Sequence, residues 1–356
     1  MSGASLDGMD AVVATFEAPD RAYCLHHLWQ PYADDLRQAL LDLHHPGAHE
    51  LERALLLSNR LAEGYAEATA CLLRQAGIPP TAIQAIGCHG QTLRHRPAEG
   101  LSLQLNQPAR LAELTGITVV ADFLSRDIAA GGQGSPICAA FLAENLRSSS
   151  CHRVLVKIGG MASITDLPPE GPVRGFDCGP GTLVMDAWVK RQWGCDYDPA
   201  GSLAAQGRVL EGLLQVLLVH PYFALSPPKS ASRGLFAPEW LERELTGRER
   251  EEDVLATLLQ LTVRCIANGI RNHCPGAQEV WLYGGGAHNE HLVKQLGVYL
   301  PSLRIDLTER LGLSVDGLEA CAIAWMARRT LLGQPGNLAE ATGARGPRIL
   351  GAIYPA

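Results

Sequence analysis

The chain has 356 residues, enough for two domains of ordinary size. Hydrophobic residues make up 47% and charged residues 19%, a balance typical of a compact enzyme and not of a disordered chain. The formal net charge is −7 and no long run of Lys and Arg occurs, which argues against general nucleic-acid binding. We see neither an apolar stretch of about 18 residues for a membrane span nor a signal-peptide pattern at the start. The ten cysteines form no Cys-x-x-Cys pair, so we expect reduced thiols in a cytoplasmic protein.

Predicted strands and helices alternate along the chain, which indicates an α/β protein with mixed sheets. Most Gly-rich or polar segments follow a predicted strand, the position where α/β folds bind ligands. Residues 175–181 read as a loop. The expected strands are 9–16, 83–88, 101–105, 117–121, two joined by a glycine turn at 159–160, and 280–283; the expected helices are 34–43, 50–75, 137–146, 182–193, 203–218, 253–274 and 315–332.

Four Gly-rich turns recur, at residues 2–8, 158–160, 175–181 and 284–287. Glycines let backbone N–H groups approach phosphate oxygens, and four such turns beside strands favour a phosphate-binding role over four unrelated tight turns. The usual nucleotide motifs do not fit. Lys229-Ser230 follows Pro228 where a P-loop requires Gly, and Asn289 stands where a dinucleotide fingerprint requires its third Gly.

Several strings resemble the anhydro-N-acetylmuramic acid kinase family. They are MSGASLDGMD at 1–10, GCHGQTLRH at 87–95, VVADF at 119–123, DIAAGGQG at 127–134, RGFDCGPG at 174–181, PKS at 228–230, PGN at 335–337 and TGA at 342–344. The matches cover the whole chain in order.

The resemblance implies a two-domain actin-like ATPase (ribonuclease-H-like) fold with mixed sheets and ATP in the interdomain cleft. We expect an N-terminal domain of residues 1–125 plus about 340–356 and a C-terminal domain of 126–339. The implied reaction opens the 1,6-anhydro bridge of the sugar with water and phosphorylates O6, giving N-acetylmuramic acid 6-phosphate in peptidoglycan recycling. ATP and Mg²⁺ are the implied cofactors and a small sugar the substrate, without nucleic acid or membrane; a homodimer is left open.

The resemblance also assigns roles to individual residues. Asp177 is the expected catalytic base, with a helix cap as the alternative. Glu319, His89, Gln91 and Thr92 are expected to bind the sugar, although Glu319 also fits a helix-surface carboxylate and His89 a structural role. Lys229 fits a phosphate or sugar-carboxylate contact, or an exposed lysine. The expected phosphate-binding residues are Gly3, Ala4, Ser5, Leu6, Asp7, Gly8, Gly159, Gly160, Gly284, Gly285 and Gly286.

Asp7 is further expected to face the metal, with a turn-stabilising aspartate as the alternative. Some positions depart from the family pattern: Ala4 replaces Thr, and Lys157 and Ser163 replace Asn. Lys157 either meets phosphate or pairs with Asp166. The family usually has a strand before Met-Ser-Gly, so we expect an apolar strand of about five or six residues upstream of Met1. A kinase for another anhydro-sugar, such as levoglucosan, and a catalytically silent nucleotide-binding relative are the competing functions.

Overall fold

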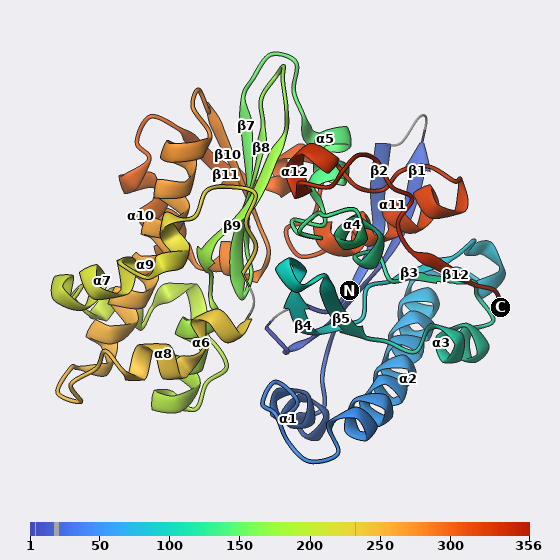
Figure 1. Ribbon diagram of the computed structural model, residues 1–356, viewed down its shortest axis with the longest axis horizontal. Helices are drawn as coiled ribbons and strands as arrows, with labels where there is room; N and C mark the ends of the chain where they lie inside the picture. The colour runs from blue at the N-terminus through green and yellow to red at the C-terminus, as the bar shows by residue number, and fades with distance from the viewer. Residues whose placement is uncertain (4, 18–20, 232) are drawn as a thin grey trace. The chain divides into compact units, whose positions relative to one another are not determined.

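The chain forms two compact units in the computed structural model, which describes residues 1–3, 5–17, 21–231 and 233–356 (Figure 1). Unit 1 comprises Met1–Leu146 and Gly312–Ala356, and unit 2 comprises Arg147–Leu311. These boundaries differ from the predicted domains, because residues 126–146 and 312–339 belong to unit 1. The physical reason is packing: α5 (Ala139–Leu146) packs on β2, and α11 (Leu318–Leu331) packs on β1 and β3.

Unit 1 contains separate small sheets. β1 and β2 form an antiparallel ribbon, β4 and β5 form another, and a third sheet has the order β12-β6-β3, with β3 parallel and β12 antiparallel to β6. The strands are β1 (Gly8–Glu17), β2 (Arg21–Pro31), β3 (Ile86–Cys88), β4 (Gln91–Arg96), β5 (Leu101–Leu105), β6 (Val119–Ala121) and β12 (Ala352–Tyr354). The remaining helices are α1 (Asp34–Asp42), α2 (Glu50–Ala76), α3 (Pro108–Thr115), α4 (Ser125–Ala129) and α12 (Ala339–Thr342).

The longest helix of unit 1, α2, is held by one apolar face. Its buried residues recur every three or four positions, which places them on one side of a helix: Leu57, Leu61, Tyr65, Ala68 and Leu72. The helix ends at Gly77, whose left-handed φ of 67° lets its N–H bond the last turn. The buried face packs against β1, β2 and α3 and forms the core of the unit.

Unit 2 is built on one five-stranded sheet in the order β11-β10-β7-β8-β9. The first three strands are parallel, whereas β7, β8 and β9 are antiparallel. Its strands are β7 (Arg153–Ile158), β8 (Met161–Leu167), β9 (Arg174–Pro180), β10 (Glu279–Tyr283) and β11 (Arg304–Leu307); its helices are α6 (Leu183–Trp193), α7 (Glu211–Leu218), α8 (Pro238–Glu242), α9 (Glu251–His273) and α10 (Glu290–Tyr299).

Helix α9 is the core helix of unit 2. The helix is long and apolar enough to cross a membrane, whereas we expected no such stretch from the sequence. However, 78% of its most apolar window is buried inside the structure, where it packs on β8 and β9. The helix is therefore apolar because a sheet and neighbouring helices surround it.

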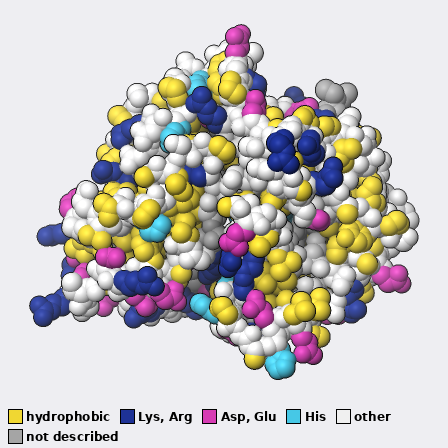
Figure 2. Space-filling model, in the orientation of Figure 1, with side chains coloured by type: hydrophobic (Ala, Val, Ile, Leu, Met, Phe, Trp, Pro, Cys, Tyr) yellow, Lys and Arg dark blue, Asp and Glu magenta, His cyan; other side chains and the backbone are white. Residues whose placement is uncertain are grey.

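Most predicted elements are confirmed, and the exceptions have local causes. Of the predicted loop 175–181, residues 175–180 belong to β9, because they pair with β8 along its length; only Gly181 lies beyond the strand. The predicted helix 203–218 begins only at Glu211; a side chain at Gly207 would lie 1.9 Å from the carbonyl oxygen of Glu252, so the chain there follows the start of α9 closely. β2 and β4 were not predicted. On the face seen in Figure 2, Lys and Arg are interspersed with acidic and apolar side chains.

Candidate functional site

The first Gly-rich loop is anchored by buried hydroxyl groups. Ser2 is 2% exposed; its Oγ accepts a 2.7 Å hydrogen bond from Tyr32 and lies 2.9 Å from the Tyr65 hydroxyl. At the far end of the loop, a side chain at Gly8 would lie 2.4 Å from the Gln30 carbonyl oxygen. Both ends of the loop are thus fixed against the core of unit 1, and only glycine fits where β1 begins.

Gln91 connects β4 to this loop. Its Nε2 donates a 2.9 Å hydrogen bond to the Gly3 carbonyl, and its Oε1 accepts one of 3.2 Å from Tyr32. The side chain is 1% exposed. Both ends of the amide therefore hold the loop in place, a role that the sequence did not reveal because 88 residues separate the partners. A contact between Gln91 and the sugar stays a prediction.

Asp7 lies on the solvent side of the same loop. The residue is exposed, and Oδ1 accepts a 2.5 Å hydrogen bond from Ser5 Oγ. Mg²⁺ in kinases is commonly held by one or two carboxylates together with phosphate oxygens and water, so an exposed carboxylate in a loop predicted to bind phosphate fits this ion. Among the described residues no group of three or more His, Cys, Asp or Glu forms a metal cage. Ala4, also expected in this loop, lies outside the described residues.

The other predicted sugar-binding residues also belong to unit 1. His89 is buried and its Nδ1 donates to the Gly90 carbonyl at 2.9 Å. Thr92 Oγ1 accepts from Gln104 at 3.2 Å. Glu319 is half-buried in the first turn of α11, so it is not a fully exposed surface carboxylate. Their roles toward a sugar stay predictions.

The glycine motifs of unit 2 come together around the end of β7. The N–H groups of Gly181 and Leu183 donate to the Gly160 carbonyl, which ties the β7–β8 turn to the start of α6. A side chain at Gly286 would lie 2.3 Å from Ile158, and one at Gly284 would lie 2.9 Å from the carbonyl oxygen of the same residue. A side chain at Gly181 would lie 2.0 Å from the Gly159 carbonyl oxygen, so glycines at 181, 284 and 286 let three stretches far apart in sequence pack against each other.

Gly285 is different from its two neighbours. A side chain added there would meet no atom within 4 Å. Packing inside the chain does not explain this glycine, whereas close approach of a ligand to the backbone would.

Asp177 lies within β9 and is 6% exposed. Its Oδ2 accepts a 2.8 Å hydrogen bond from the Ala231 N–H, its N–H donates to the Lys229 carbonyl at 3.0 Å, and its carbonyl accepts from the Tyr222 hydroxyl at 2.7 Å. The pairing of β8 with β9 shifts register next to it, between Ala162 and Ser163, and such bulges are frequent beside active sites. The helix-cap alternative is wrong, because α6 begins only at Leu183 with Thr182 as its N-cap.

Lys229 is buried beneath the same strand, so the exposed-lysine alternative is wrong. Nζ donates to the Tyr222 carbonyl at 3.2 Å and lies 4.7 Å from the centre of the Tyr222 ring. Burial lowers the pKa of Lys229, while Cys178, Cys265 and Asp177 oppose that shift. The ammonium group is therefore held inside unit 2 by a carbonyl and an aromatic face.

The strand register of the sheet rules out one of the two alternatives for Lys157, the pairing with Asp166. Asp166 bonds His152, with 2.5 Å between Oδ1 and Nε2. Lys157 pairs across the strands with Ser163, three residues from Asp166, so its side chain lies on the opposite face of β8. Pairing with Asp166 is therefore wrong. The Lys157 stem instead lies beside Gly159, where a Cβ would be 2.9 Å from Cε.

A buried carboxylate that the sequence analysis did not single out holds the C-terminal motifs. Asp127 is 1% exposed and accepts hydrogen bonds from Gly134 N–H at 2.9 Å, Asn337 Nδ2 at 2.7 Å and Thr342 Oγ1 at 2.8 Å. The strings at 127–134, 335–337 and 342–344 are thus one structural element of unit 1. The signal that identifies Asp127 is the convergence of three polar groups on its carboxylate, and this convergence is visible only in the folded chain.

Comparison with known proteins gives a consistent result. The family model described as "Anhydro-N-acetylmuramic acid kinase" matches residues 1–356. The chain is similar to the anhydro-N-acetylmuramic acid kinase of Nitrosomonas europaea, with 52% identity covering 100% of this chain and 98% of that one. It is also similar to the enzyme of that name from Thiobacillus denitrificans, with 51% identity covering 100% and 96%.

Similarity to solved structures is more distant. The Acidaminococcus fermentans (R)-2-hydroxyglutaryl-CoA dehydratase component A aligns with a TM-score of 0.44 and 11% identity, covering 89% of this chain and 97% of that one. This likeness is too distant to carry an argument. With the family model spanning every residue and half of the positions identical in full-length relatives, the chain belongs to the anhydro-N-acetylmuramic acid kinase family.

Proposed function

We propose that the protein is an ATP-dependent kinase that hydrolyses the 1,6-anhydro bridge of anhydro-N-acetylmuramic acid and phosphorylates O6. The observation that carries the proposal is the position of Asp177, a buried carboxylate beside a bulge of β9 and next to the glycine motifs of unit 2. A carboxylate held this way fits a base that takes a proton from an attacking water.

The proposed reaction has two consecutive steps. The oxygen of water bonds C1 of the sugar as the C1–O6 bond breaks, and Asp177 takes the proton of that water. The released O6 attacks the γ-phosphorus, the bond to ADP breaks, and the product is N-acetylmuramic acid 6-phosphate. Such a product belongs to the recycling of peptidoglycan.

The proposal assigns phosphate, metal and sugar binding to residues of unit 1 and nucleotide binding to glycines of unit 2. In unit 1 the loop from Gly3 to Gly8 cradles phosphate, with Asp7 facing Mg²⁺, which neutralises phosphate charge when bound. His89, Thr92 and Glu319 bind the sugar, and Gln91 acts chiefly by fixing Gly3. In unit 2, Gly285 leaves its backbone open to the nucleotide, and Gly159 and Gly160 form the turn of the same nucleotide site.

The proposal places the reaction in the cytoplasm, where ATP is available and thiols stay reduced. A homodimer in solution is part of this proposal and is checked by light scattering on the eluted protein.

Phosphorus NMR on the purified chain tests the proposed activity. With Mg-ATP and anhydro-N-acetylmuramic acid we expect ADP and a sugar 6-phosphate resonance. Levoglucosan, which lacks the lactyl and N-acetyl groups, serves as the competing substrate. Preferential turnover of levoglucosan would favour the other anhydro-sugar kinase, and ATP binding without turnover of either sugar would favour the silent relative.

A further inference from the structure

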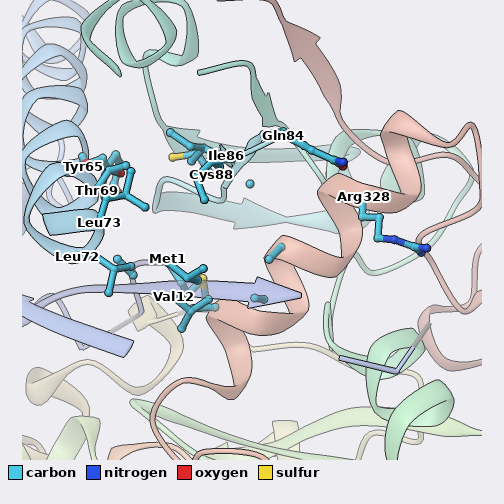
Figure 3. Close-up of a pocket in the computed structure, with 18 of the residues that line it drawn as sticks. Met1, Val12, Tyr65, Thr69, Leu72, Leu73, Gln84, Ile86, Cys88 and Arg328 are labelled. Carbon is cyan, nitrogen blue, oxygen red and sulfur yellow. Dashed lines mark hydrogen bonds between the residues drawn. The ribbon is translucent and has the colours of Figure 1, made fainter. Parts of the chain in front are cut away.

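A groove of about 580 Å³ in unit 1 lies between β1, β3, α2 and α11 (Figure 3). Apolar side chains such as those of Leu72, Leu73 and Ile86 form much of its wall, and none of the residues proposed for ATP, the sugar or the base lines it. The proposed base, Asp177, is instead contacted in unit 2 by the segment 221–231.

This segment holds the backbone of Asp177. Strand β9 is the last strand of its sheet, so β8 covers only one of its edges. The Asp177 N–H donates to the Lys229 carbonyl at 3.0 Å, and the Tyr222 hydroxyl donates to the Asp177 carbonyl at 2.7 Å. The N–H and C=O groups of one residue point to the same side of an antiparallel strand. Both backbone groups of Asp177 therefore bond the segment 221–231 and not β8, at the place where the pairing of β8 with β9 shifts register.

The same segment also holds the carboxylate. The Ala231 N–H donates to Oδ2 of Asp177 at 2.8 Å, two residues beyond the Lys229 carbonyl that accepts from the Asp177 backbone. A displacement of the segment would therefore move both the main chain and the carboxylate of the base. The groups that fix the segment thus also fix the direction in which the carboxylate points.

The side chain of Lys229 closes the segment on itself. Nζ donates to the Tyr222 carbonyl at 3.2 Å and lies 4.7 Å from the centre of the Tyr222 ring. The ring in turn packs edge to face on Phe236, with 5.6 Å between the ring centres, and Phe236 is fully buried. Lys229 and Tyr222 therefore join the two parts of the segment that contact Asp177 and attach them to the core of unit 2.

Stability does not account for a charged side chain at position 229. Lys229 is buried, and burial lowers its pKa, because an ammonium group is unfavourable away from water. Replacing a buried charge by a neutral side chain of similar volume often leaves a protein equally stable or more stable. A positive charge beside a buried carboxylate, however, favours the ionised form of that carboxylate, which is the form that can accept a proton.

The other titratable groups near this pair carry no charge near pH 7. Burial raises the pKa of the Tyr222 hydroxyl and of the thiols of Cys178 and Cys265, and it lowers the pKa of His273 on α9. These four groups are therefore neutral, and Lys229 supplies the positive charge beside the carboxylate.

We propose that Tyr222 and Lys229 are positioning residues for Asp177, which fix the backbone of the base at the open edge of β9 and keep its carboxylate ionised. This proposal rests on the proposed function, because it takes Asp177 as the base. Lys229 then acts through Tyr222 and Asp177, and not by binding a phosphate or the carboxylate of the sugar.

Steady-state kinetics with Mg-ATP and anhydro-N-acetylmuramic acid tests the positioning role of Tyr222. Tyr222→Phe removes the hydroxyl that bonds Asp177 and keeps the ring and the carbonyl that hold Lys229. Since small displacements of a reacting group are costly, we expect kcat to fall at least about tenfold, with both KM values within about threefold. Tyr197→Phe, at an exposed position of unit 2, is the matched control and should change neither.

The dependence of kcat on pH tests the charge of Lys229. Lys229→Met keeps the length of the side chain and removes the ammonium group, so we expect a similar fall in kcat. The acidic limb of its pH profile should also move to higher pH by at least about one unit, a shift that Tyr222→Phe should not show. The exposed Lys190 also donates to a carbonyl, and Lys190→Met is the matched control with an unchanged profile.

Amide hydrogen exchange tests the same contacts without substrate. We expect the amide of Asp177, which bonds the Lys229 carbonyl, to exchange at least about fivefold faster in both variants. The amide of Phe176, which pairs with Ile164 of β8, should change little and is the internal control.

The outcomes separate this proposal from the proposed function. Normal kcat in Tyr222→Phe and Lys229→Met, with turnover by the unmodified chain, would overturn the positioning role and leave the proposed function standing. A higher KM with normal kcat in Lys229→Met would also overturn it, because that result would mark a direct contact with substrate. Absence of turnover in the unmodified chain would refute the proposed function itself, and with it the base that these residues position.

Discussion

Nε2 of Gln91 donates a hydrogen bond to the carbonyl oxygen of Gly3, so the start of β4 holds the first loop of the chain. Tyr32 bonds the other end of the same amide. The position of the proposed phosphate loop thus depends on a side chain that the sequence resemblance assigns to the sugar.

Gln91→Leu should therefore weaken ATP binding. The substitution keeps the size of the side chain but leaves the Gly3 carbonyl and the Tyr32 hydroxyl without this partner, which costs about 1–3 kcal/mol of unfolding free energy. We expect a higher KM for ATP, measured by steady-state kinetics, together with lower stability in urea. Gln38→Leu on the exposed face of α1 is the matched control and should change neither. A normal KM for ATP in Gln91→Leu would show that Gln91 does not position the loop.

Asp177→Asn should lose catalysis. Asn keeps an oxygen that can accept from Ala231 but cannot take a proton from water, so we expect kcat to fall at least about a hundredfold. ATP affinity, measured by calorimetry, should change little. Asp166→Asn alters a buried carboxylate on the neighbouring strand and should lower stability while kcat stays within a few-fold. Turnover of Asp177→Asn close to that of the unmodified protein would rule out the proposed base.

Gly285 and Gly286 should respond differently to alanine. Gly286→Ala puts a methyl group 2.3 Å from Ile158, so we expect a lower melting temperature. Gly285→Ala meets open space and should melt normally, yet bind ATP more weakly if the nucleotide approaches this backbone. Normal ATP affinity in Gly285→Ala, measured by calorimetry, would remove Gly285 from the nucleotide site.

Asp127→Ala should destabilise unit 1. The change leaves Gly134, Asn337 and Thr342 without their shared acceptor, and we expect a loss of about 2–4 kcal/mol in urea unfolding. Asp122→Asn, at an exposed position with a φ of 63° that Asn tolerates, is the control and should stay within about 0.5 kcal/mol. Equal stabilities for the two variants would contradict this role of Asp127.

The pair of His27 and Asp10 should make stability depend on pH. His27 Nε2 lies 2.9 Å from Asp10 Oδ1, and this hydrogen bond raises the pKa of His27. The pKa of His27 in the folded state exceeds the unfolded value of about 6.5. The pair therefore makes its full contribution to the stability of the folded state below about pH 6.5, and this contribution is lost as the pH rises through the folded-state pKa. Urea unfolding at pH 5.5 and 8.5 should show a larger stability loss in His27→Gln at the lower pH. The same loss at both values would contradict the assignment.

The sequence was sufficient where local pattern decides structure. The helical pattern of residues 50–75 predicted α2, and the glycines at 159–160 predicted the turn between β7 and β8. It failed where long-range contacts decide. Residues 175–181 contain three glycines, which favour a loop, but pairing with β8 makes residues 175–180 a strand. The Tyr222 partner of Asp177 is 45 residues away and the Asn337 and Thr342 partners of Asp127 are 210 and 215 residues away, so no spacing rule could find them.

The pairing of β12 with β6, and of α11 with β1, has a consequence for biosynthesis. Unit 2 is one continuous stretch of chain, so it can complete its fold while the ribosome is still translating the C-terminal segment. Unit 1 cannot, because Asn337 and Thr342 reach Asp127, and β12 reaches β6, only when translation is nearly finished. Unit 1 is thus begun first but completed last, so a nascent chain would already display a folded unit 2 before unit 1 is complete.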